Sequence, residues 1–112
     1  MFKIVQNPTY TWPVTVEMPV DGGRVEKATF DIEFKRLTQT RLNEIRDAIE
    51  KSAITDVDLS REVITDWSGI TDADGPVPYS EAARDQLLDI PLVASAIVMA
   101  FFGSIAGAKR KN

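Results

Sequence analysis

The acidic run from Ile70 to Gly75 is the part of the sequence that comes closest to a metal-binding pattern. Aligned with a calcium-binding loop, Asp72, Asp74, Gly75 and Glu81 occupy the third, fifth, sixth and twelfth positions. The first position is Ile70, which offers no side-chain oxygen, and two prolines follow the glycine. Because a hard cation needs several oxygen ligands, we interpret this run as an Asp-Gly turn and expect no metal site.

Two pairs of closely spaced carboxylates, Asp56 with Asp58 and Asp72 with Asp74, raise the question of acid–base catalysis. General acid–base chemistry needs a carboxyl group whose pKa is shifted inside a cleft, and both pairs lie in polar sequence. We therefore interpret them as helix-capping and turn residues. The chain also contains no histidine and no cysteine, so the commonest general base and the thiolate nucleophile are both absent. These features predict a protein that is not an enzyme and that uses no cofactor.

The composition is that of a folded protein of ordinary size. The chain has 112 residues, of which 44% are hydrophobic and 27% are charged, and this length predicts a single domain over 1–112. The net charge of −4 argues against nucleic acid as a partner, since such binding needs a basic surface. Residues 107–112 form a short basic tail. No apolar run of sufficient length opens the chain, so we expect no secretion signal.

The first third of the chain, about 2–36, has the alternation of a β-hairpin. Apolar residues recur at every second position from Trp12 to Val20 and again from Ala28 to Phe34. Between them, Asp21-Gly22-Gly23 supplies the positive φ angles of a tight turn. Val25 is out of phase, which predicts a bulge or a register adjustment near Glu26 and Lys27. A short third strand around Phe2–Ile4 would make the sheet three-stranded and antiparallel.

Two prolines indicate where the first strand of this hairpin lies in the sheet. Neither Pro13 nor Pro19 has a backbone N–H, so neither can donate a ladder hydrogen bond. We therefore expect this strand to lie at a sheet edge.

The helical region, about 38–106, is predicted to contain four helices. The first begins at a Thr38 or Thr40 cap and ends near Ser52, with its apolar stripe at Leu42, Ile45 and Ile49. The second is expected over Val57–Trp67, after a capping box formed by Thr55 and Asp58. Its apolar stripe consists of Leu59, Val63, Ile64 and Trp67.

A loop from Ser68 to Tyr79 separates these helices from the last two. Ser80 caps the third helix, and Pro91 begins the fourth, which runs from about Leu92 to Ile105. The predicted fold class is therefore α+β, with a β-hairpin followed by about four helices.

Residues 90–108 carry no charge and are followed by Lys109-Arg110-Lys111, which leaves two readings open. The first is a helix shielded by polypeptide, either the chain's own core or a partner. The second is a C-terminal membrane span with a basic cytoplasmic flank. We favour the first, because Pro91, glycines, serines and several alanines make the segment only moderately hydrophobic. Phe101 and Phe102 point about 100° apart on a helix, so one can enter the core while the other is exposed.

The span from Val63 to Gly75, followed by Val77-Pro78-Tyr79-Ser80, resembles a pattern found in the tail assembly chaperones of long-tailed bacteriophages and prophages. The pattern combines a tryptophan–glycine turn, an Asp-Gly turn, a serine cap, and a helix that ends near a proline before an alanine-rich apolar helix. The extended segment with Asn7-Pro8 and Trp12-Pro13-Val14 agrees with it. We assign the motif a structural role in this chain. Its members are Trp67, Gly69, Asp74, Gly75 and Ser80.

The resemblance implies a non-catalytic factor that acts in the bacterial host cytoplasm and is absent from the mature virion. Proteins of this kind coat the tape-measure protein and keep it soluble until the major tail protein polymerises around it. Self-association of the chaperone is compatible with this role, and a longer form made by ribosomal frameshifting is common. The role requires an apolar contact surface on the last helix, and we nominate Met99, Phe101 and Phe102 as partner-binding residues.

Overall fold

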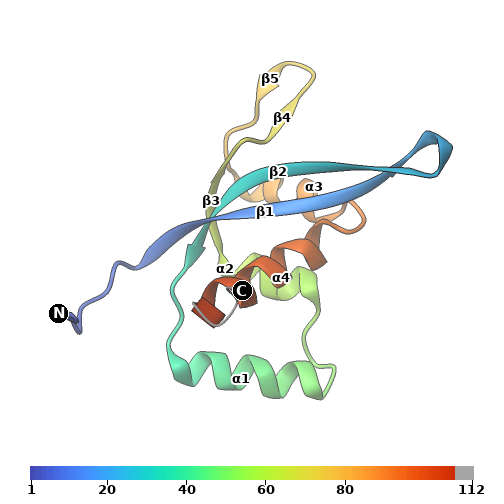
Figure 1. The fold of residues 1–112 in the computed structure, drawn as a ribbon. Helices are drawn as coiled ribbons and strands as arrows, with labels where there is room; N and C mark the ends of the chain where they lie inside the picture. Colours follow the sequence, from blue (N-terminus) through green and yellow to red (C-terminus); the bar gives the residue numbers. More distant parts are fainter. Residues whose placement is uncertain (108–112) are drawn as a thin grey trace.

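The computed structural model describes residues 1–107 and has the predicted α+β architecture, with a three-stranded antiparallel sheet and four α-helices (Figure 1). The basic residues that follow Gly107 in the predicted tail lie outside the described part of the chain. The main strands are β1 (Thr9–Val20), β2 (Arg24–Lys35) and β3 (Ile64–Ser68), and a short 3₁₀ turn (Asp21–Gly23) joins the first two. The helices are α1 (Gln39–Glu50), α2 (Asp56–Val63), α3 (Glu81–Leu88) and α4 (Val93–Ala106).

The hairpin of β1 and β2 forms as predicted, and the strand order β1-β2-β3 leaves β1 at an edge of the sheet. Its register runs without interruption from the pair Thr9–Lys35 to the pair Val20–Arg24, so the predicted bulge or register adjustment near Glu26 and Lys27 was wrong. Val25 needs no bulge, because it lies beyond the helices at the tip of the hairpin and is 58% exposed. An out-of-phase apolar residue can simply face solvent there.

The third strand comes from a different part of the chain than predicted. Residues 2–4 form no strand, and the strand beside β2 is β3, in a segment that was expected to continue the second helix to Trp67. A bulge explains why this segment looks helical in the sequence. β2 residues Glu33 and Phe34 pair with Asp66 and Ile64, which leaves Thr65 as an extra residue. Ile64 and Trp67 therefore both face the core although they are three residues apart.

The loop from Ser68 to Tyr79 contains a small hairpin of β4 (Thr71–Asp72) and β5 (Gly75–Pro76). In Figure 1 this hairpin projects from the end of β3, away from the helices. Gly69 enters it with a φ of +84°, and an added Cβ there would touch Phe30 at 3.5 Å. The β4–β5 hairpin contains the Asp-Gly turn that was predicted from the sequence.

The core lies between one face of the sheet and the helices, and α4 is its main apolar layer. α4 packs against β1 and α2, and Figure 1 shows it lying under the β1–β2 hairpin. Val93, Ile97 and Phe101 of α4 are buried against the sheet, as are Leu59 and Val63 of α2. The sheet residues of this core are Val14, Val16, Phe30, Ile32, Phe34, Ile64 and Trp67.

Helix boundaries agree closely with their capping signals. The side chains of Thr38, Thr55 and Ser80 each accept a hydrogen bond from the backbone of the helix they precede, and Thr55 forms the full capping box with Asp58. Two residues of the predicted apolar stripe of α1, Leu42 and Ile45, are buried, whereas the third, Ile49, is not. Ile49 is 44% exposed, because it lies at the last turn of the helix, beyond the core.

The helix α4 in the apolar segment from residue 90 onward is not continuous with α3. α3 and α4 are bent by 103° at their junction, where Leu92 adopts a left-handed φ of +76°. Pro91 lies before the first turn of α4, so the fourth helix begins slightly later than predicted. No single helix within residues 1–107 is long and apolar enough to cross a membrane, although the bent pair of α3 and α4 together has a suitable length and composition.

Candidate functional site: a groove between β1 and α4

An open groove of about 690 Å³ lies between the edge strand β1 and the outer face of α4. Its apolar lining includes Trp12, Leu92 and Met99, which all expose more than a third of their surface. Among the described residues that line it, Glu17 is the only charged one. The full lining is Trp12, Pro13, Thr15, Glu17, Leu92, Ser95, Ala96, Met99, Ala100 and Gly103. An exposed apolar hollow of this kind is typical of a protein-interaction site.

One wall of the groove is the free edge of β1, whose outward-facing backbone groups can be identified from hydrogen bonds. Residues of an antiparallel strand alternate between bonding to the neighbouring strand and facing away from it. The carbonyl of Pro8 accepts a bond from the N–H of Arg36 at 2.8 Å, so even-numbered residues at this end face β2. The carbonyl of Glu33, opposite Thr11, instead accepts from the hydroxyl of Thr65 on β3 at 2.9 Å.

Odd-numbered residues of β1 therefore point their backbone groups toward the groove side. Pro13 and Pro19 both occupy such positions, where the missing N–H costs the β1–β2 ladder nothing. Thr11, Thr15 and Glu17 direct backbone N–H groups outward. β1 consequently offers a set of donors and acceptors that could bond an added strand.

The other wall, α4, is held against the sheet by a hydrogen bond to β1 and by an aromatic contact with β2. The phenol of Tyr10 on β1 and the hydroxyl of Ser104 are 2.7 Å apart. Deeper in the core, the rings of Phe34 and Phe101 meet edge-to-face with centroids 5.4 Å apart. The groove is therefore formed by two elements whose relative position is held by core contacts.

The three nominated partner-binding residues lie at different depths in α4. Met99 is 75% exposed and lines the groove, whereas Phe101 is only 1% exposed and belongs to the core. Phe102 is half-buried, and its ring packs 5.5 Å from that of Phe101. Only Met99 among the three therefore presents a large apolar surface within the groove.

The residues of the turn motif form contacts around the β4–β5 hairpin rather than in the groove. The indole N–H of Trp67 donates to the carbonyl of Val77 at 2.8 Å, and its ring meets that of Tyr79 edge-to-face at 5.1 Å. Ser80 accepts from the N–H of Ala83 at 3.0 Å.

Within the turn itself, Gly75 has a φ of +120°. Asp74 donates its N–H to the carboxylate of Asp72 at 2.8 Å. These contacts hold the chain between β3 and α3.

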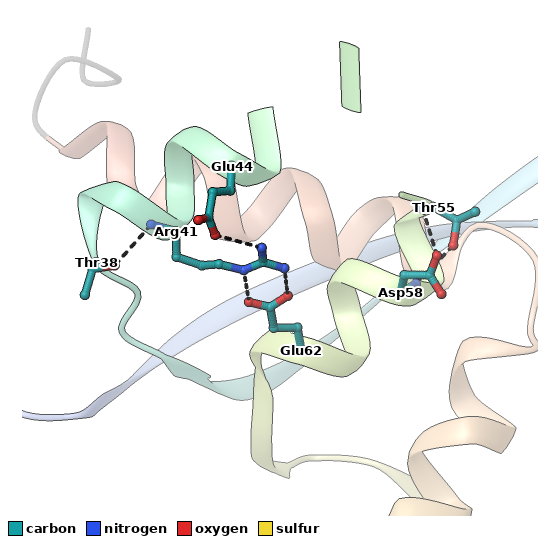
Figure 2. A network of polar contacts seen from close by, with 6 residues as sticks. All are labelled: Thr38, Arg41, Glu44, Thr55, Asp58 and Glu62. Carbon is teal, nitrogen blue, oxygen red and sulfur yellow. Dashed lines mark hydrogen bonds and ion pairs between the residues drawn. The ribbon is translucent and has the colours of Figure 1, made fainter. Parts of the chain in front are cut away.

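A cluster of charged groups joins α1 to α2 (Figure 2). The Arg41 guanidinium donates to both oxygens of Glu62, at 2.7 and 2.6 Å, and to Glu44 at 3.1 Å. Hydrogen bonding from Arg41 lowers the pKa of the Glu62 carboxyl, and bonding from Thr55 lowers that of Asp58. Both carboxyls are thus held ionised by structural partners, which does not suit a general acid–base role near neutral pH.

No group of three potential metal-ligating side chains comes together anywhere in residues 1–107. The groove was not predictable from the sequence, because Trp12 fits the buried face of an alternating strand and Leu92 fits the start of a helix. In the structure Trp12 is 38% exposed and lines the groove between β1 and α4. The proline that directly follows Trp12 is a sequence signal for this position, because prolines within sheets occur mainly on edge strands.

These features define a small α+β protein that presents an apolar groove beside an unpaired strand edge. A family model described as phage tail assembly chaperone matches residues 1–112, and the chain belongs to that family. The match confirms the resemblance found in the sequence. No curated protein and no solved structure matches the chain.

Proposed function

We propose that this protein is a non-catalytic chaperone that binds the tape-measure protein of a phage tail and keeps it soluble during assembly. The observation that supports this most directly is the β1–α4 groove, in which Met99, Leu92 and Trp12 present apolar surface on an otherwise acidic chain. Burying such surface under an apolar segment of a client is favourable in proportion to the area removed from water. The net charge keeps each copy soluble while the groove is occupied.

The client segment is proposed to be apolar and to lie along the groove between the two walls. The α4 wall is smooth, because Ala96, Ala100 and Gly103 have small side chains that allow close approach. Met99 is well suited to contact varied sequences, since its unbranched side chain adapts to many shapes. A long client could then be covered by many copies, each contributing one weak contact.

The proposed setting is the bacterial cytoplasm, before the major tail protein polymerises and before the mature virion forms. In this scheme the major tail protein takes the client over as the tail assembles. The chaperone is then released and is absent from the finished tail.

Co-expression with a tape-measure protein from the same genome tests the proposal. The readout is the fraction of the tape-measure protein that remains soluble after cell lysis, with wild type, Met99→Glu and Ile49→Glu compared at equal expression. Ile49→Glu is the matched control, because Ile49 is also an exposed apolar helix residue but lies on α1 outside the groove. We expect wild type and Ile49→Glu to keep the client soluble and Met99→Glu to fail.

Two results would contradict the proposal at different levels. If wild type does not increase the soluble fraction at any ratio, the chaperone function itself is wrong. If Met99→Glu works as well as Ile49→Glu, the function stands but the groove is not its site.

A further inference from the structure

The first six residues, here called the N-terminal arm, form a largely apolar segment with a bend at Ile4 and Val5 that lacks a covering surface within the described structure. Phe2, Ile4 and Val5 are 84%, 94% and 87% exposed, and the arm belongs to no strand or helix. Figure 1 shows it leading away from the body of the protein, beyond the start of β1. Apolar side chains gathered on one exposed segment are typical of a contact with another polypeptide.

Asn7 and Pro8, which connect the arm to β1, are bonded to Arg36 on the side of β1 away from the groove. The carbonyl of Asn7 accepts a bond from the guanidinium of Arg36 at 2.8 Å, and the carbonyl of Pro8 accepts from its N–H at the same distance. The guanidinium also lies 4.8 Å from the centre of the Tyr10 ring. Arg36 directly follows β2, on the side of β1 opposite to the groove. Folding the arm back onto its own β1 edge would break these bonds.

We propose that the N-terminal arm of one copy pairs as a strand with the free edge of β1 in a second copy and lies in its β1–α4 groove. The backbone donors of Thr11, Thr15 and Glu17 face outward there and would bond the arm's carbonyls. The arm and the edge from Thr11 to Glu17 are of similar length, roughly 20 Å at about 3.3 Å per residue.

Three side chains of the arm match the two faces of this edge. In a strand, Phe2 and Ile4 point to one face, and Lys3 and Val5 point to the other. With the two apolar residues directed toward α4 and Met99, Lys3 lies on the face that carries Glu17. Glu17 is the only charged residue among the described lining of the groove, and its sign is opposite to that of Lys3.

The arm of a second copy would therefore occupy the groove when no client is bound, and a client would have to displace it. This displacement step rests on the proposed function, because it needs a client for the same groove. Self-association does not, since it involves only copies of this chain. The two ideas can consequently fail separately.

Sedimentation of the full-length protein without any client, over a wide concentration range, tests the self-association. One variant changes the arm, with Phe2→Asp and Ile4→Asp combined, and a second changes the edge, Thr15→Pro. The edge variant removes one outward N–H at a position equivalent to those of Pro13 and Pro19, so the β1–β2 ladder keeps its bonds. Thr15→Val is the matched control, because it alters the side chain but keeps the N–H.

We expect wild type and Thr15→Val to associate equally, and the arm and edge variants to associate at least about tenfold more weakly. A wild type that stays monomeric throughout, including one whose own arm covers the groove, would overturn the proposal. So would an arm variant that associates like wild type. If Thr15→Pro does not fold, as judged by circular dichroism, the arm variant decides alone. Failure of the tape-measure protein to become soluble in the co-expression test would leave these sedimentation results unchanged.

Discussion

The ring of Phe101 on α4 meets the ring of Phe34 on β2 edge-to-face, and both side chains are fully enclosed by the core. This contact fixes the helix that forms one wall of the groove, while Met99, two residues earlier, faces the groove itself. The core contact and the proposed partner contact therefore lie on different faces of one helix, and substitutions can separate them.

Phe101→Ala is expected to lower the free energy of unfolding by about 3–5 kcal/mol, because it leaves a cavity against Phe34. Met99→Ala should change it by no more than about 0.5 kcal/mol, since the side chain is exposed. Urea unfolding followed by far-ultraviolet circular dichroism measures both. Equal losses in the two variants would contradict the assignment of Phe101 to the core and Met99 to the surface.

Trp67→Phe tests the contact that holds the segment after β5. The substitution removes the indole N–H that bonds to Val77 and leaves that carbonyl without its donor, which should cost about 1–3 kcal/mol. Trp12→Phe is the control, because Trp12 lies at the groove and should change stability by less than about 0.5 kcal/mol. Thermal unfolding of both proteins provides the comparison, and a control that loses as much as Trp67→Phe would refute the prediction.

Gly69→Ala is expected to destabilise the protein by about 1–2 kcal/mol, since an alanine must adopt the left-handed φ of +84° there. Space is not the obstacle, because the added methyl group would make an ordinary contact of 3.5 Å with Phe30. Gly103→Ala should have the opposite effect and stabilise α4 by about 0.5–1 kcal/mol, as no atom outside the adjacent turns of the helix lies within 4 Å of the added methyl group. Opposite signs in urea denaturation are the expected outcome, and a stabilised Gly69→Ala would show that this turn is not strained.

The contact between α1 and α2 should make stability depend on pH in the acid range. The pKa of Glu62 is lowered in the folded protein, first by its hydrogen bonds from Arg41, so the native state binds a proton less readily than the unfolded chain. The stabilisation is then complete above the ordinary carboxyl pKa of about 4 and is lost as pH falls through the lower folded value.

Glu62→Gln should therefore lose stability at neutral pH and show a shallower decrease between about pH 5 and pH 3. The urea midpoint measured at several pH values gives this slope. Glu26→Gln, at the hairpin tip and in no ion pair of the described structure, should follow wild type. Identical slopes for Glu62→Gln and wild type would mean that the contact does not couple to folding.

Elements with local signals were predictable from the sequence. The β1–β2 hairpin follows from strict alternation and a glycine turn, and three helix starts follow from Thr38, Thr55 and Ser80. Each of these depends on residues within a few positions of one another. For the same reason, the edge position of β1 could be inferred from its prolines alone.

The strand β3 was missed because its bulge hides the alternation. With Thr65 inserted, Ile64 and Trp67 share a face at the spacing of a helix, and they continue the true stripe of α2. The run Val63-Ile64-Thr65 of β-branched residues was the contrary signal, since such residues favour strands. The groove was missed for a different reason. It exists only between β1 and α4, and the sequence of neither segment indicates how much of β1 is covered by α4.

Pro13 and Pro19 also limit how far strand addition can go. An edge that bonds to a neighbouring chain at every position can template a growing fibril. Each proline interrupts the row of donors, so β1 can accommodate a short partner but cannot seed an unbroken cross-β stack. The same two residues that mark the open side of the sheet therefore protect the protein from aggregating there.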